Sequence, residues 1–178
     1  IPVLVRQRRL SRHLAGTQTP ASLKAGMTKA EIRWPAEAIW ESVAPLLPGF
    51  TVEVLPELDS SNTELMRRAR VGRLDPVLLV LEQQTAGRGR LGRQWSSAAG
   101  GLRSLTFSLG LALAPQDWSG LSLAVGLSVA QSLHPDIRLK WPNDLWWHDR
   151  KLAGILIETA RRRMPPVCPR RRPVWTNC

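Results

Sequence analysis

A glycine- and arginine-rich segment at residues 84–95 follows an apolar run, Val77 to Leu81. The segment contains Gly87, Gly89, Gly92, Arg88, Arg90 and Arg93. Glycine lacks a Cβ, so the backbone can fold tightly over a ligand. The planar, permanently charged arginine side chains suit phosphate or carboxylate. The segment matches neither a GxGxxG loop nor a Walker loop, which ends in Lys-Ser/Thr. We therefore expect an anion-binding loop at the end of a buried strand.

The charge of the chain is concentrated at its two ends. The net charge is +11, yet residues 34–160 contain twelve basic and thirteen acidic side chains. Residues 1–33 and 161–178 each carry a net charge of +6. A nucleic-acid-binding domain normally presents its basic residues on the folded surface. This distribution disfavours an arginine-rich nucleic-acid binder, which is the alternative suggested by the total charge and by the arginine-glycine segment.

Composition divides the chain into three parts. Residues 1–26 are basic and free of acid, and we expect an N-terminal extension outside the fold, with an organelle-targeting peptide as the alternative. Residues 27–160 have the composition of a globular domain. Residues 161–178 are rich in Arg and Pro without hydrophobic periodicity, and we expect a disordered, non-native tail. Both cysteines, Cys168 and Cys178, lie in this tail, so the core has no disulfide framework, as in a reducing cytoplasm.

Hydrophobic periodicity and turn residues predict a mixed α+β domain. We expect helices over residues 34–46, from the capping residues 59–62 to Arg70, and over 118–133. We expect strands at 50–55, 77–82, 104–112, 137–140, 145–148 and 151–159, the last two joined by a tight turn at Asp149 and Arg150. Because helices and strands alternate without a strict βαβ repeat, the prediction is a mixed β-sheet with flanking helices. No apolar stretch is long enough to span a membrane.

A second group of polar residues lies at 140–158. Lys140 and Asp144 flank a turn stiffened by proline, which suits a cation and a metal-binding carboxylate near one phosphate. Asn143 and Asp144 supply the oxygen ligands that Mg²⁺ prefers. Lys151 begins the second arm of the following hairpin and can project towards the same pocket. Each feature alone is a weak signal, but together with the arginine-glycine loop they predict a nucleotide site.

The chain resembles the biotin protein ligase family in three segments that occur in the family's order. They are residues 59–62, residues 84–95 and residues 140–158, within a resemblance that covers residues 50–158. It implies the catalytic-domain fold of biotin and lipoate ligases, which is related to class II aminoacyl-tRNA synthetases. The family usually has Thr where this chain has Ser61, which keeps the hydroxyl. The family's domain continues beyond the position of Glu158, so we expect a fold that is incomplete at its C-terminus.

The resemblance implies a biotin–[acetyl-CoA-carboxylase] ligase that uses ATP and Mg²⁺. Such an enzyme adenylates biotin to biotinyl-5'-AMP and transfers biotin to a lysine of the biotin carboxyl carrier domain of acetyl-CoA carboxylase. We expect a cytoplasmic enzyme with no membrane partner. We also expect no DNA partner, because the residues before 50 leave no room for a winged-helix domain. The alternatives are a lipoate or octanoate ligase of the same superfamily, and an inactive truncated remnant.

The resemblance also implies residue roles. Catalysis is expected from Lys151 and Arg90. Biotin is expected to be bound by Ser60, Ser61, Asn62, Gln84, Gly87, Arg88, Gly89, Arg90, Lys151 and Gly154. ATP and its phosphates are expected to be bound by Arg90, Arg93, Trp95, Lys140 and Asn143. Mg²⁺ is expected to be held by Asn143 and Asp144, with Glu158 supporting the surroundings of the ion.

Overall fold

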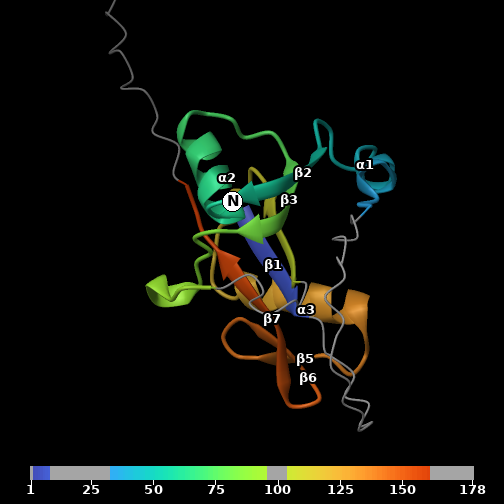
Figure 1. Cartoon of the computed structure of the whole chain (residues 1–178), viewed down its shortest axis with the longest axis vertical. Helices are drawn as coiled ribbons and strands as arrows, with labels where there is room; N and C mark the ends of the chain where they lie inside the picture. Colours follow the sequence, from blue (N-terminus) through green and yellow to red (C-terminus); the bar gives the residue numbers. More distant parts are fainter. Residues whose placement is uncertain (1, 9–32, 96–103, 161–178) are drawn as a thin grey trace, which may run out of the picture.

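A seven-stranded mixed sheet forms the centre of the molecule (Figure 1). The computed structural model describes residues 2–8, 33–95 and 104–160, and for residues 2–8 it describes the backbone. The strand order is β2-β3-β4-β1-β7-β6-β5, in which β2 and β3 run parallel and every other neighbouring pair is antiparallel. The strands are β1 (Pro2–Arg8), β2 (Thr51–Leu58), β3 (Val77–Gln84), β4 (Ser104–Gly110), β5 (Arg138–Lys140), β6 (Asp144–Trp147) and β7 (Arg150–Ile157).

Two helices cover opposite faces of this sheet. Helix α2 (Ser61–Arg70) packs through Leu65 on the face formed by Val77, Leu79 and Leu81 of β3. Helix α3 (Leu121–Leu133) packs on the other face, which carries Phe107 and Ile155. The register of β3 with β4 pairs Leu79 with Ser108 and Val80 with Phe107, so the two core clusters lie on alternate faces.

Two shorter elements complete the described structure. Helix α1 (Ala36–Val43) precedes β2 and contacts it, and the 3₁₀ helix η1 (Arg90–Gly92) lies in the arginine-glycine segment. No helix in the described part of the chain is long and apolar enough to cross a membrane. The predicted α+β class, with a mixed sheet and flanking helices, is confirmed.

Strand β1 corrects the expectation that residues 1–26 lie outside the fold. Pro2–Arg8 lies in the middle of the sheet, where it pairs antiparallel with β4 on one side and with β7 on the other. The run Val3-Leu4-Val5 has high strand propensity, and it was masked by the basic composition of the longer segment. Its pairing satisfies backbone groups of β4 and β7 that would otherwise form exposed edges. Residues 9–26 and the tail 161–178 lie outside the described residues.

The hairpin between β6 and β7 turns one residue earlier than expected. Trp147 pairs with Arg150, and the turn residues His148 and Asp149 have φ values of 45° and 56°. Positive φ at both central residues is the geometry of the two-residue turn that matches strand twist. The sequence analysis placed the turn at Asp149 and Arg150 because it took His148 as the last strand residue. Arg150 belongs to β7 instead.

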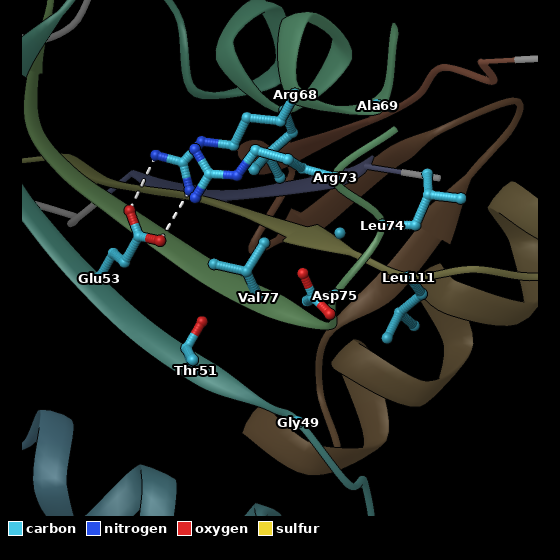
Figure 2. Close-up of a pocket in the computed structure, with 12 residues that line it drawn as sticks. Gly49, Thr51, Glu53, Arg68, Ala69, Arg73, Leu74, Asp75, Val77 and Leu111 are labelled. Carbon is cyan, nitrogen blue, oxygen red and sulfur yellow. Dashed lines mark hydrogen bonds and ion pairs between the residues drawn. The ribbon is translucent and has the colours of Figure 1, made fainter. Parts of the chain in front are cut away.

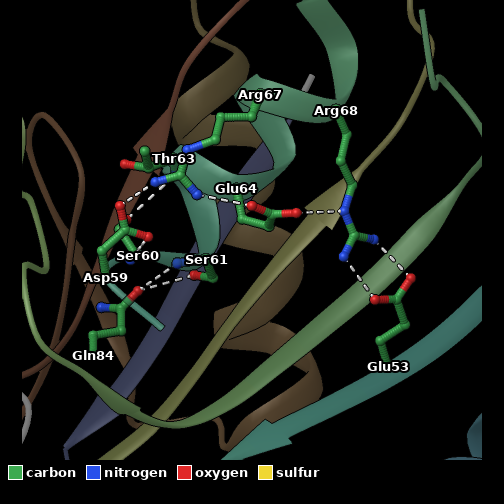
Figure 3. Close-up of polar contacts among 9 residues, drawn as sticks. All are labelled: Glu53, Asp59, Ser60, Ser61, Thr63, Glu64, Arg67, Arg68 and Gln84. Atoms are coloured by element: carbon green, nitrogen blue, oxygen red, sulfur yellow. Dashed lines mark hydrogen bonds and ion pairs between the residues drawn. The ribbon is translucent and has the colours of Figure 1, made fainter. Parts of the chain in front are cut away.

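A chain of ion pairs runs along the surface of α2 (Figure 3). Arg68 donates to both carboxylate oxygens of Glu53 at 2.7 and 2.8 Å and to Glu64 at 2.9 Å. Arg67 donates to Glu64 at 2.8 Å and to Asp59. The hydrogen bond from Arg68 lowers the pKa of Glu64 below its ordinary value. These ion pairs therefore link β2 to Asp59, two residues before the start of α2.

Replacing Glu64 with Gln should change how the free energy of unfolding depends on pH in the acidic range. A carboxyl group whose pKa is lowered by folding stabilises the protein above its unfolded pKa and loses that contribution as pH falls through the folded value. We expect Glu64→Gln to lower the free energy of unfolding by about 0.5–1 kcal/mol at neutral pH and to change it little below about pH 3. Urea melts across this range measure it. The exposed Glu41→Gln on α1 is the control, and an unchanged pH profile in Glu64→Gln would contradict the assignment.

Candidate active site

The first turn of α2 is buried against the sheet. Ser60 caps the helix, with its hydroxyl accepting from the backbone N–H of Thr63 at 3.4 Å, as the predicted capping segment required. The backbone N–H of Ser60 donates to Asp59 Oδ1 at 2.7 Å. Ser60, Ser61 and Asn62 are at most 1% exposed. Buried polar groups of this kind need hydrogen-bond partners, and the sheet supplies them.

Gln84, at the end of β3, anchors Ser61 (Figure 3). Its Oε1 accepts from the backbone N–H of Ser61 at 2.8 Å and from the Ser61 hydroxyl at 3.1 Å. Ser108 on β4 lies 2.8 Å from the Ser61 hydroxyl and 2.9 Å from Asn62 Oδ1. The sequence analysis missed Ser108. The signal available was the pair Thr106 and Ser108, which places two polar side chains on one face of a predicted strand.

The side-chain nitrogen of Gln84 has no hydrogen-bond partner among the described residues, although it is buried. Its oxygen is already oriented by Ser61, so the two Nε2 protons are directed elsewhere. A buried donor without an acceptor costs free energy unless a ligand supplies the acceptor. This nitrogen is therefore a candidate donor to a ligand oxygen beside the start of α2.

The described part of the arginine-glycine segment folds back on itself. Trp95 N–H donates to the carbonyl of Gly87, and Gly89 N–H donates to the carbonyl of Arg93, both at 2.7 Å. A Cβ at Gly87 would lie 2.6 Å from the Trp95 carbonyl oxygen and 2.8 Å from Gln84 Nε2. Glycine is therefore required at position 87 by close backbone approach. The loop therefore packs closely against the Gln84 side chain at Gly87.

The β6–β7 hairpin presents Lys151 beside the loop. Lys151 Nζ lies 2.7 Å from Asp144 Oδ1 and 5.1 Å from the centre of the Trp95 ring. Both contacts hold the ammonium group beside the loop. The prediction that Lys151 and Asp144 approach one pocket agrees with this geometry.

Asn143 is fixed by the neighbouring strand. Its Nδ2 donates to the carbonyl of Ile155 at 2.7 Å, and Ile155 N–H donates to the carbonyl of Asn143 at 2.9 Å. With its amide nitrogen held in this way, Asn143 directs its Oδ1 towards the loop, where Arg90 Nη1 lies 3.5 Å away. Two segments that are far apart in the sequence thus meet at this asparagine.

A cavity of about 520 Å³ lies between the loop and the hairpin. Four cations and one carboxylate border it, so its charge suits an anionic ligand. Of the predicted site residues, the cavity brings together Arg88, Gly89, Arg90, Arg93, Trp95, Asn143, Asp144, Lys151 and Gly154. It is also lined by Leu91, Gln94, Trp141, Pro142, Ile155 and Leu156.

Other predicted residues lie elsewhere. Lys140 does not line this cavity, and its ammonium group lies 3.7 Å from the centre of the Trp146 ring. Ser60, Ser61, Asn62, Gln84 and Gly87 do not line it either. Ser60, Ser61, Asn62 and Gln84 belong to the buried network described above. Gly87 packs against Gln84 and accepts from the backbone N–H of Trp95, so it connects this network to the loop.

A second cavity, of about 220 Å³, lies beside α2 and β2 (Figure 2). The Glu53–Arg68 ion pair forms one wall, and Arg73 and Asp75 lie around it. None of the predicted site residues lines this cavity. The candidate site is therefore the larger cavity between the loop and the hairpin.

The described residues contain no cluster of three or more His, Cys, Asp or Glu side chains that could hold a metal ion by themselves. Asp144 Oδ1 is paired with Lys151, and Asn143 Oδ1 faces Arg90. The oxygen donors expected for Mg²⁺ are therefore present, but each has a cation beside it. Such a pair fits a divalent ion only when a ligand brings further negative oxygens.

Comparison with known proteins identifies the family. The model of the biotin/lipoate A/B protein ligase family matches residues 56–166, which is more than half of the chain. The chain belongs to this family. The match includes all three segments on which the resemblance rests, and the predicted family is confirmed.

Two curated relatives are similar over the same region. The Escherichia coli bifunctional ligase/repressor BirA is 44% identical over 117 residues, which are 63% of this chain and 36% of the relative. The Mycobacterium tuberculosis biotin–[acetyl-CoA-carboxylase] ligase is 42% identical over 119 residues, which are 62% of this chain and 45% of the relative. The matched region thus spans less than half of either relative.

Solved structures agree with this assignment. A biotin acetyl coenzyme A carboxylase synthetase from Helicobacter pylori, with bound biotinylated ATP, matches with a TM-score of 0.54 and 30% identity. That match covers 62% of this chain and 55% of the other. A biotin protein ligase from Leishmania major in complex with biotin matches with a TM-score of 0.51 and 27% identity, over 64% of this chain and 52% of the other.

The packing at Gly87 predicts different effects of two alanine substitutions. Gly87→Ala should lower the free energy of unfolding by about 1–3 kcal/mol, because the added Cβ overlaps the Trp95 carbonyl and Gln84. Gly89→Ala is the matched control, since its Cβ would lie 3.5 Å from the Arg93 carbonyl oxygen, an ordinary contact, and φ is −108°. It should be neutral or stabilising by less than about 1 kcal/mol. Denaturant melts distinguish them, and equal effects would contradict the close approach.

Proposed function

We propose that the site activates biotin with ATP and transfers it to a lysine of a carrier protein. The observation that carries this proposal is the cavity itself, which is bordered by four cations. Gln84, whose buried amide nitrogen has no partner among the described residues, lies outside the lining of the cavity. Biotin offers a carboxylate for the cations and a ureido oxygen for the donor. The biotin ligases named among the relatives support the same choice.

In the first half-reaction, a biotin carboxylate oxygen would attack the α-phosphorus of ATP, and pyrophosphate would leave. Two anions must meet, so their repulsion is the main obstacle, and fixed positive charge reduces it. We assign Arg88, Arg90 and Lys151 to the carboxylate and α-phosphate, with Arg93 on the polyphosphate side. Lys140 would reach the phosphates only by leaving the Trp146 ring, so we give it no role in this step.

In the second half-reaction, a neutral lysine amine of the carrier would attack the carbonyl carbon of biotinyl-5'-AMP. The C–N bond forms, the amine loses a proton, and AMP leaves with the electrons of the broken C–O bond. The carrier that we propose is the biotin carboxyl carrier domain of acetyl-CoA carboxylase, by analogy with the named relatives. Trp95, with its backbone tied to Gly87, would help to keep water from the mixed anhydride.

Polar groups beside α2 favour biotin over lipoate or octanoate. Gln84 Nε2 needs an acceptor, and Ser60 and Ser61 lie in the same buried network. A ureido head group provides an acceptor, whereas a dithiolane or an alkyl tail would leave the amide unpaired. Sites built to hydrogen-bond a polar group discriminate strongly against ligands that lack it.

Mg²⁺ is proposed as a companion of the nucleotide. When bound, it would neutralise negative charge on the phosphates. Asn143 Oδ1 and the second carboxylate oxygen of Asp144 are the protein oxygens that fit it, and Glu158 is not assigned to its surroundings. Because Lys151 and Arg90 neighbour these oxygens, the ion is expected to enter together with ATP rather than alone.

A binding and turnover experiment tests the function. The 178-residue chain is titrated with biotin and with lipoate by calorimetry, and it is then incubated with ATP, Mg²⁺ and biotin to measure biotinyl-5'-AMP. We expect biotin to bind and lipoate not to bind. Biotin binding without turnover would favour the alternative of a non-catalytic remnant. Preferential binding of lipoate, or no binding of either acid, would contradict the proposal.

Two lysine substitutions compare a lysine that lines the cavity with one that lies outside it. Lys151→Ala should reduce biotinyl-5'-AMP formation by about a hundredfold, because it removes a cation from the reacting anions. Lys140→Ala, the matched control, should stay within about threefold, because Lys140 lies over Trp146. Affinity for biotinyl-5'-AMP is a second readout that needs no turnover. Similar losses in both variants would refute the different assignments of the two lysines.

A further inference from the structure

The carboxylate of Glu158 connects all three segments of the site. Glu158 directly follows β7, and its Oε2 accepts from Asn62 Nδ2, at the start of α2, at 2.8 Å. Arg88 Nη2, in the arginine-glycine loop, lies 3.2 Å from Oε1 and 3.3 Å from Oε2. These partners are 96 and 70 residues away in the sequence. One side chain therefore joins β7, α2 and the loop.

One of these two contacts is made by a buried side chain. Asn62 is fully buried, and its Oδ1 lies 2.9 Å from the Ser108 hydroxyl, which orients its amide so that Nδ2 faces Glu158. The Glu158 side chain is 26% exposed and the Arg88 side chain is 48% exposed. A carboxylate already held by a buried donor loses less conformational freedom when it pairs with a second group. The ion pair with Arg88 therefore has a fixed anchor on one side.

Arg88 differs from the other arginines of the loop because it has a carboxylate partner. Within residues 33–95 and 104–160, Arg90 and Arg93 have no carboxylate partner, and Arg90 reaches only Asn143 Oδ1 at 3.5 Å. Nη2 of Arg88 is occupied by Glu158, while Nε and Nη1 have no partner in the described part of the chain. Arg88 also lines the cavity, so its remaining donors are available to an anion there.

We propose that Glu158 is a positioning residue that holds Arg88, and with it the arginine-glycine loop, against the start of α2. This inference rests on the proposed function for its effect on biotin. Glu158 fixes the guanidinium from outside the cavity, so that its free donors meet the substrate carboxylate without first being ordered. The sequence analysis expected Glu158 to support Mg²⁺. The structure instead shows its carboxylate in contact with Asn62 and Arg88, so we assign it to positioning Arg88 rather than to a metal ion.

The isosteric variant Glu158→Gln tests the charge alone. The glutamine oxygen can still accept from Asn62, but the negative charge that pairs with Arg88 is lost. Trypsin cleavage after Arg88, Arg90 and Arg93, followed by mass spectrometry without ligand, should be about two- to fivefold faster than in the parent chain. Glu82→Gln is the matched control, since Glu82 accepts from Trp34 and lies outside the site. Cleavage at sites outside the loop should not change.

Biotin binding gives the second readout. Glu158→Gln should weaken biotin binding about two- to fivefold, with kcat changed less than KM wherever turnover is measured. The effect should shrink at high salt, which screens the ion pair in the parent chain. In a double-mutant cycle, Glu158→Gln and Arg88→Lys should be non-additive, whereas Glu158→Gln and Arg93→Lys should be additive.

The outcomes separate this inference from the proposed function. If the parent chain binds biotin and Glu158→Gln has the same affinity and loop cleavage rate, the positioning role is wrong and the function stands. If no biotin binds but loop cleavage still rises in Glu158→Gln and not in Glu82→Gln, the positioning role stands and the function is wrong. Additive effects of Glu158→Gln and Arg88→Lys would also overturn the proposed coupling.

Discussion

The hydrogen bonds of the buried residues Ser61 and Asn62 hold the site together. Ser61 is bound to Gln84 of β3, and Asn62 contacts Ser108 of β4 and Glu158 after β7. Buried polar groups with satisfied partners specify a single arrangement, because any other packing leaves donors or acceptors unpaired. The start of α2 is therefore fixed relative to three strands at once. The loop and the β6–β7 hairpin are placed from this fixed point.

Opposite charges are used differently on the two sides of α2. On the surface that faces β2, the arginines Arg67 and Arg68 are neutralised by Asp59, Glu53 and Glu64. Around the cavity, Lys151 is paired with Asp144 and Arg88 with Glu158, whereas Arg90 and Arg93 have no carboxylate partner among the described residues, so that positive charge is left over. The first arrangement stabilises a helix, whereas the second costs stability until an anion arrives. This contrast distinguishes the cavity as a binding site more clearly than the total charge of the chain does.

Local patterns predicted much of the fold and many of the residues around the cavity. The cap at Ser60, strand β3 and the residues flanking the β6–β7 hairpin follow from nearby residues. Strand β1 could not be predicted in this way, because its place between β4 and β7 depends on two distant strands. The pairing of Lys140 with Trp146 was missed for the same reason, whereas the alternation of Thr106 and Ser108 on one face of a strand was a local signal for Ser108. Tertiary partners decide such contacts, and periodicity does not encode them.

Lys151, to which we assign a role in catalysis, shows how a cation can be both held and available. Its ammonium group contacts the Asp144 carboxylate and the face of the Trp95 ring, so it is oriented before substrate enters. Neither contact is fully buried, because the lysine side chain is 37% exposed. Exposed ion pairs are weak, and an incoming phosphate or carboxylate can therefore compete for the same group. In the proposed function, the cost of reorganisation is small because Lys151 already lies beside the cavity, and preorganised charge of this kind is a general source of electrostatic catalysis.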